Sequence, residues 1–214
     1  MEVIEAKSAG FCFGVARAVK IAQELADSAQ KPRMLGSVIH NQRVTEDLAR
    51  QGMTAISGPE EAQAGDTVLL RAHGVGRAVY EDLEARGTSV VDATCPKVAY
   101  VQQLVSAAEA EGRQPVMIGD PSHPEVLGVG GWCGNLMVFS GPEEVEQWAQ
   151  TAENAGGMAL TVVSQTTLRR ETWESSLKIL KKECTNLKIF DTICNATHTR
   201  QSEAALLAAR VDAM

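Results

Sequence analysis

The sequence has no long apolar run and no export signal. None of its segments approaches the ~18 apolar residues of a membrane-spanning helix. Its first residues, MEVIEAK, lack the basic flank and apolar block of a signal peptide. We therefore expect a cytoplasmic protein without a membrane span. An excess of basic residues is also missing: the formal net charge is -7, which argues against general nucleic-acid binding.

Short metal-binding and disulfide patterns are absent as well. No C-x-x-C pair and no H-E-x-x-H segment occurs in the 214 residues, and the five cysteines are an odd number. In a chain without an export signal, reduced thiols, metal ligands or cluster ligands are favoured over a disulfide framework. A metal site would have to bring together residues from distant parts of the chain.

The sequence does contain short apolar runs that alternate with amphipathic segments, a pattern typical of parallel α/β proteins. The candidate strands are residues 3–6, 34–38, 68–71, 89–91, 115–119, 136–139, 160–163 and 187–190. The candidate helices are residues 15–29, 44–51, 79–86, 97–111, 143–152, 168–182 and 199–209. We expect residues 1–95 and 96–193 to form two similar α/β units. Residues 194–214 would begin a third unit that is cut short.

Three cysteines stand where a strand-like segment gives way to a helix-like one. They are Cys12, Cys95 and Cys194, and the last two each follow an aspartate by three residues. Ligand sites of open α/β sheets gather at the carboxyl ends of the strands, and helix N-termini favour negative charge. Converging sulfurs would form a metal or cluster site with one coordination position free. Cys133 and Cys184 lack this setting, and we interpret them as incidental.

Other polar residues follow strands on the same expected edge. His40, His73 and His123 each come just after a candidate strand, and imidazoles bind metals or phosphates. Glu125 lies in a proline-restricted loop, where neighbouring negative charge would raise its pKa toward that of a general acid; a solvated loop glutamate is the alternative. The hydroxyl of Thr166 is expected to cap a helix or to bond to a substrate or to Glu125.

Seven segments together resemble the 4-hydroxy-3-methylbut-2-enyl diphosphate reductase family. They are AGFCFGVARA at residues 9–18, IHN at 39–41, RAHGV at 71–75, DATCP at 92–96, GDPSHPE at 119–125, SQTT at 164–167 and TICNAT at 192–197. The likeness runs from residue 1 to about residue 209, and the segments come in the family's order. Seven separate segments make the resemblance highly specific.

The resemblance implies an α/β trefoil of similar parallel-sheet units around a central [4Fe-4S] cluster. Cys12, Cys95 and Cys194 match the cluster ligands, which leaves one iron for the hydroxyl of the substrate. The implied reaction is the reductive dehydroxylation of (E)-4-hydroxy-3-methylbut-2-enyl diphosphate to isopentenyl and dimethylallyl diphosphates. It is the last step of the non-mevalonate isoprenoid pathway. Ferredoxin or flavodoxin supplies the electrons in this family.

The resemblance also implies roles for five further side chains. His40 and His73 match positions that bind the diphosphate, and His123 matches a substrate-binding position near the reacting end. Glu125 matches the proton donor, and Thr166 a residue that hydrogen-bonds near it. In the family a Ser-x-Asn turn and a later serine of the third unit complete the diphosphate pocket. This chain ends before either, so we expect it to be poorly active alone.

Two other hypotheses fit the residues without the resemblance. The first is a zinc-dependent hydrolase of a phosphorylated small molecule, with thiolate or mixed cysteine and histidine ligands and an open water position. The second is a non-catalytic α/β protein that binds a phosphosugar and whose cysteines belong to the core. Metal and sulfide analysis would distinguish all three hypotheses.

Overall fold

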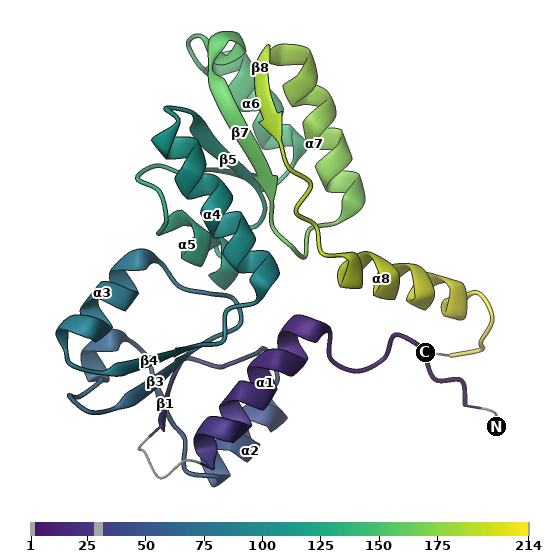
Figure 1. The fold of residues 1–214 in the computed structure, drawn as a ribbon. Helices are drawn as coiled ribbons and strands as arrows, with labels where there is room; N and C mark the ends of the chain where they lie inside the picture. The colour runs from purple at the N-terminus through teal and green to yellow at the C-terminus, as the bar shows by residue number, and fades with distance from the viewer. Residues whose placement is uncertain (1–2, 28–31, 214) are drawn as a thin grey trace.

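A computed structural model describes residues 3–27 and 32–213 of the chain. Within these ranges the chain forms two four-stranded sheets, and all neighbouring strands are parallel. Figure 1 shows the first sheet and its helices in the lower half of the molecule and the second in the upper half. The α/β class expected from the alternating pattern is confirmed.

The first sheet has the strand order β2-β1-β3-β4. Its strands are β1 (Pro32–Leu35), β2 (Thr54–Ile56), β3 (Thr67–Leu70) and β4 (Ser89–Asp92). Helices α1 (Phe13–Ala26) and α2 (Gln42–Arg50) cover one face, and α3 (Arg77–Ala85) covers the other. Successive strand residues point to opposite faces, so Met34 lies in the core under α1 and α2, and Leu35 in the core under α3.

The second sheet repeats this arrangement with the order β6-β5-β7-β8. Its strands are β5 (Gln114–Ile118), β6 (Met137–Phe139), β7 (Ala159–Ser164) and β8 (Asn186–Ile189). Helices α4 (Pro96–Ala110) and α5 (Pro124–Gly130) cover one face, and α6 (Pro142–Thr151) and α7 (Arg170–Glu183) cover the other. Because both faces are covered, most of the central strand β7 is buried, including the apolar residues Leu160, Val162 and Val163.

A repeated pentapeptide accompanies the repeated sheet. The sequence Ser-Gly-Pro-Glu-Glu occurs at residues 57–61 and 140–144, each time just after the edge strand β2 or β6. In both copies the last glutamate accepts a hydrogen bond from the N–H of the serine, at 3.1 Å in the first and 2.8 Å in the second. The same local bond thus ends the same strand of each sheet. The unit boundaries after residues 95 and 193 stay predictions.

Two expectations about individual elements are wrong. Residues 3–6 form no strand, and Val3 is 80% exposed; the free edge of β1 is taken by β2, a three-residue strand that the apolar pattern did not reveal. Glu125, expected in a loop, lies in α5 (Pro124–Gly130), which begins with Pro124 at a position that needs no N–H donor. Residues 28 and 29 of the expected first helix lie outside the described residues.

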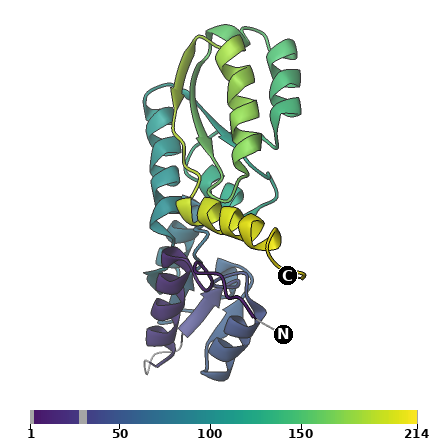
Figure 2. The same ribbon diagram turned by 90° about the vertical axis from the view of Figure 1, so that its right-hand side faces the viewer.

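Helix α8 (Asn195–Ala208) belongs to the core of neither sheet. None of its residues is buried, although the structure describes all of them. Figure 2 shows it crossing beside the junction of the two units. Among the described residues, no helix combines the length and apolar character needed to span a membrane.

Candidate active site

Each of the three predicted cysteine ligands is the residue at which a helix begins. Cys12 is the N-cap of α1, Cys95 of α4 and Cys194 of α8. All three have extended backbones, are partly exposed, and make no side-chain cap hydrogen bond, so their sulfurs remain available. The N-terminal ends of α1, α4 and α8 meet near the centre of the molecule, as Figures 1 and 2 show. Three positive helix ends therefore face one region, which favours bound negative charge.

The turns before Cys95 and Cys194 share one construction. The backbone N–H of Cys95 donates to the carbonyl of Ala72 at 2.9 Å, and that of Cys194 donates to the carbonyl of Thr166 at 2.8 Å. Each acceptor lies two residues beyond the end of the central strand β3 or β7. The aspartate three residues before each cysteine accepts a hydrogen bond from the backbone N–H of the residue just before that cysteine. Asp92 accepts from Thr94, and Asp191 accepts from Ile193. The Asp-x-x-Cys spacing is therefore a turn signal, with the aspartate in a structural role.

Gly14 sets the distance between α1 and the second cysteine. A Cβ at this buried position would lie only 2.4 Å from Cys95 Sγ, far inside normal contact. The first turn of the helix that starts at Cys12 thus lies directly against the sulfur of Cys95. The side chain of any other residue at position 14 would occupy the space that the Cys95 sulfur needs.

The donor chemistry of the three thiols fits an iron–sulfur cluster. Among the described residues, no three His, Cys, Asp or Glu side chains lie close enough together to bind one metal ion. Soft thiolate ligands at converging helix N-termini are the chemistry that such a cluster requires.

The three predicted histidines lie together. The ring centroids of His40 and His73 are 4.3 Å apart, and His123 lies 6.0 Å from the first and 5.7 Å from the second. Burial, with the neighbouring charges of His40, His123 and Arg71, lowers the pKa of His73 to about 4. Burial and His40 also lower the pKa of His123, although Asp120 opposes this. At neutral pH, His73 and His123 are therefore uncharged in the absence of an anion.

One hydrogen bond assigns the tautomer of His123. Its Nδ1 accepts from the backbone N–H of Glu125 at 3.1 Å and so caps α5. In the neutral ring, Nε2 then carries the proton and is the nitrogen free to donate.

Glu125 and Thr166 form a buried pair. Glu125 is only 2% exposed, and its Oε1 accepts from the Thr166 N–H at 2.7 Å while its Oε2 accepts from the Thr166 hydroxyl at 2.6 Å. Burial raises the pKa of Glu125, and the two hydrogen bonds from Thr166 partly offset the increase. Of the two roles expected for the threonine, the contact with Glu125 is the one observed; the N-cap of α7 is Arg169. A buried carboxyl with a raised pKa is suited to proton donation.

Helix α5 carries His123 and Glu125 to the first unit. Its C-terminal end approaches the loop after His73 so closely that a Cβ on Gly131 would lie 2.4 Å from the Cα of Gly76. The indole N–H of Trp132 donates to the carbonyl of Val75 at 2.8 Å. These contacts between the units bring together histidines that are far apart in the sequence.

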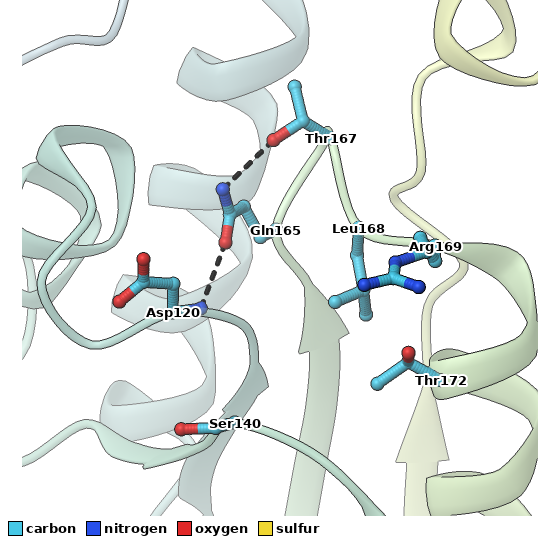
Figure 3. A pocket seen from close by; sticks show the side chains of 7 residues that line it. All are labelled: Asp120, Ser140, Gln165, Thr167, Leu168, Arg169 and Thr172. Carbon is cyan, nitrogen blue, oxygen red and sulfur yellow. Dashed lines mark hydrogen bonds between the residues drawn. The ribbon is translucent and has the colours of Figure 1, made fainter. Parts of the chain in front are cut away.

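A pocket at the ends of β5 and β7 is lined by residues to which the sequence assigned no role. The pocket, shown in Figure 3, has a volume of about 280 Å³ and is lined by Asp120, Ser140, Gln165, Thr167, Leu168, Arg169 and Thr172. The Gln165 side chain accepts from the Asp120 N–H and donates to the Thr167 hydroxyl, both at 2.9 Å. It therefore ties the end of β5 to the end of β7. The position of Gln165 next to Thr166 was the feature of the sequence that could have indicated a role in the site.

Comparisons with known proteins agree with this geometry. The sequence profile of the family described as "LytB protein" matches residues 3–214. A protein of Caldanaerobacter subterraneus subsp. tengcongensis named 4-hydroxy-3-methylbut-2-enyl diphosphate reductase is 40% identical, over 100% of this chain and 74% of its own length. A protein of Alkaliphilus oremlandii with the same name is 37% identical, over 100% of this chain and 75% of its own length.

Two solved structures are similar. One, described as (E)-4-hydroxy-3-methyl-but-2-enyl diphosphate reductase, the terminal enzyme of the non-mevalonate pathway, has 36% identity and a TM-score of 0.80 over 98% of this chain and 74% of that one. The reductase from Plasmodium falciparum, at 24% identity with a TM-score of 0.87 over 95% of this chain and 64% of that one, supports the fold. The chain thus spans about three quarters of the length of its curated relatives, and it belongs to the LytB protein family.

Proposed function

We propose that this protein is an iron–sulfur reductase of (E)-4-hydroxy-3-methylbut-2-enyl diphosphate. It removes the hydroxyl group as water and forms isopentenyl and dimethylallyl diphosphates. The observation that carries the proposal is the convergence of three cysteine-initiated helices near three clustered histidines and a buried glutamate. The names of the similar reductases support the same substrate.

Cys12, Cys95 and Cys194 would hold a [4Fe-4S] cluster at the meeting point of their helices. When bound, such a cluster supplies electrons and a Lewis-acidic iron for the leaving oxygen. The helix N-termini contribute a field that stabilises the anionic centre. The absence of a side chain at Gly14 lets the Cys95 sulfur approach the first turn of α1, the helix that begins at Cys12.

His40, His73 and His123 would bind the diphosphate end of the substrate and the region next to it. The rings of His73 and His123 are neutral before binding because burial lowers their pKa values. A bound diphosphate would raise these pKa values, so the anion and protons bind together. We therefore expect diphosphate affinity to increase as the pH falls, until the free histidines or the diphosphate become protonated.

Glu125 would donate the proton, and Thr166 would hold it in place. Because burial raises the pKa of the carboxyl, Glu125 keeps a proton to a higher pH than an exposed glutamate does. Thr166 contacts both carboxyl oxygens, so the side chain has one orientation. A ferredoxin or flavodoxin donor and a cytoplasmic location stay predictions.

The zinc hydrolase hypothesis receives no support from a specific contact. No described trio of His, Cys, Asp or Glu surrounds a single point. Three thiolates spread over different irons agree better with the three helix ends.

Anaerobic reconstitution of the chain with iron and sulfide tests the cluster. We expect brown protein with roughly four irons and four sulfides per chain and visible absorbance that dithionite bleaches. Cys95→Ser should lose this uptake, whereas Cys133→Ser is the matched control, because Cys133 begins no helix and its sulfur contacts the Gly130 carbonyl at the end of α5. Zinc without sulfide in the wild type, or equal iron in both variants, would refute the proposal.

Glu125→Gln tests the proton donor. In a complete enzyme, the variant should keep its cluster and its affinity for pyrophosphate but turn over far more slowly, because the amide cannot donate an acidic proton. Glu153→Gln, on the exposed surface, is the control. Turnover equal to that of the control variant would show that Glu125 is not the acid.

A further inference from the structure

The segment before Cys12 is held by two side chains of α8. Arg200 Nε donates to the Ser8 carbonyl at 3.1 Å, and Arg200 Nη2 donates to the Gly10 carbonyl at 2.6 Å. Glu203, one turn further along α8, accepts from the N–H groups of Lys7 at 2.7 Å and Ser8 at 2.8 Å and also from the Ser8 hydroxyl. The two side chains thus bind both the donors and the acceptors of residues 7–10.

Apolar packing contributes little to this contact. No residue of α8 is buried, and an open hollow of about 260 Å³ lies where the segment meets the helix, lined by Ala6, Ser8, Gly10, Arg200, Ala204 and Leu207. The segment belongs to no strand. Its position relative to α8 therefore depends on the polar contacts of Arg200 and Glu203.

A second arginine makes an equivalent contact at the next cysteine. Arg17 of α1 donates to the Thr94 carbonyl at 3.1 Å and to the Asp92 carbonyl at 3.5 Å, in the turn that leads to Cys95. Arg17 lies five residues after Cys12, and Arg200 lies six residues after Cys194. In both cases one cysteine begins a helix, and an arginine of that helix donates hydrogen bonds to the segment that precedes another cysteine.

We infer that Arg200 and Arg17 are positioning residues, which fix Cys12 relative to Cys194 and Cys95 relative to Cys12. A guanidinium group suits this role because its planar fork donates to two carbonyls at once, whereas a lysine ammonium has no such fixed geometry. Neither arginine needs to touch the substrate. The consequence for metal binding rests on the proposed cluster, but the positioning itself does not.

Alkylation of the individual cysteines in the metal-free protein tests the positioning. We expect Arg200→Gln to increase the rate at Cys12 about fivefold, because exposed charged contacts contribute modestly, while leaving Cys95 and Cys194 unchanged. Arg17→Gln should increase the rate at Cys95 in the same way. Arg210→Gln, which removes the same charge from the exposed end of the α8 region, is the matched control.

A lysine variant separates the geometry of the guanidinium group from its charge. Arg200→Lys keeps the charge but loses the fork, so it should fall between the wild type and Arg200→Gln at Cys12. Rates unchanged from the control, or raised equally at all five cysteines, would overturn the inference. Mass analysis of the separate cysteine peptides gives the rates.

Cluster loading then distinguishes the two proposals. If the wild type takes up iron and sulfide, Arg200→Gln and Arg17→Gln should release iron to a chelator several-fold faster than Arg210→Gln. Release at the control rate would overturn the inference. If the wild type takes up no cluster but the alkylation pattern is found, the proposed function fails and the positioning role stands.

Discussion

The turns that carry Cys95 and Cys194 differ from the segment that carries Cys12 in what fixes their backbones. The two turns follow strands, and their cysteine N–H groups bond to carbonyls just beyond the strand ends. The Cys12 segment follows no strand, and its polar groups bond to α8, where Arg200 and Ser8 are 192 positions apart in sequence. Two cysteines are thus held by the sheets that precede them, and the third by a contact with α8.

This difference should appear in local stability. The sheet-held turns border buried cores, whereas the contact with α8 is polar and largely exposed. Exposed polar contacts open more readily than those that border a buried core. We therefore expect the Cys12 segment to open first, and the site to form fully only when this segment and α8 are in contact.

The largest effect should come from Gly14→Ala, because Gly14 lies where the helix that begins at Cys12 meets the turn that carries Cys95. The new Cβ would lie 2.4 Å from Cys95 Sγ, so α1 or the sulfur must move, at a loss of ~1–3 kcal/mol of unfolding free energy. Iron uptake should fall several-fold, measured together with denaturant unfolding.

Gly130→Ala is the control for this change, because its Cβ would meet only Leu136 at 3.8 Å, an ordinary contact. Equal iron uptake by the two glycine variants would mean that the approach of α1 to Cys95 is unimportant.

Thr192→Val should weaken one sheet-held turn while sparing the other. The Thr192 hydroxyl donates to the Ser164 carbonyl at 2.6 Å and accepts from the Ser164 N–H at 2.8 Å, all buried, whereas Ala93 holds the same place in the first unit. Loss of a buried hydrogen bond should lower the unfolding free energy by ~1–3 kcal/mol.

The same variant should speed the alkylation of Cys194, with Cys95 unaffected and exposed Thr199→Val as the control. Faster reaction at Cys95 as well would contradict the independence of the two turns.

Thr166→Val should have a smaller effect, because the Thr166 N–H still bonds to Glu125 Oε1. The lost hydroxyl favours the charged carboxyl, so the pKa of Glu125 should rise further, at a loss of about 1 kcal/mol in stability. A titration of the labelled glutamate carboxyl carbons measures this rise.

The hydrogen bond from the Cys194 N–H should persist in this variant, since its acceptor is the backbone carbonyl of residue 166. Thr166→Ser keeps the hydroxyl and should restore the original titration; an unshifted carboxyl in Thr166→Val would rule out the hydroxyl as a determinant.

The smallest effect is an acid-dependent release of the Cys12 segment. Hydrogen bonds from Ser8 and Lys7 lower the pKa of Glu203. The contact therefore contributes at pH values above the usual glutamate pKa, and it is lost as the pH falls through the lowered value. Hydrogen exchange at residues 7 and 8, corrected for the intrinsic rate, should lose protection over that range.

The amides of Cys95 and Cys194 should keep their protection there, since they bond to carbonyls that do not titrate in this range. Glu203→Gln should remove the pH dependence. Equal loss of protection at all three cysteine segments would contradict the comparison.

Much of the architecture could be read from local patterns. Alternating apolar runs located both sheets, because buried parallel strands are apolar on both faces. The strand β2 was not predicted, because three residues are too few to show a periodic pattern. The helix α5 was not predicted either, because its glycine and proline residues suggest a loop. Glu125 was therefore assigned to a loop, although it lies in the first turn of a helix.

The candidate residues were found in the sequence, but most of their contacts were not. The position of Thr166 after a strand left two roles open, and only the fold placed its hydroxyl 2.6 Å from Glu125. Nothing in the spacing of Arg17, Arg200 or Glu203 indicates which backbone groups they bind.

The sequence by itself determined that the chain alternates strands and helices and that cysteines stand where three helices begin, because these features depend on neighbouring residues. Only the tertiary structure decided which of those helix ends meet, how closely α1 approaches Cys95, and that α8 holds the segment before Cys12. Those contacts join residues far apart in the chain, and their geometry depends on the packing of whole elements.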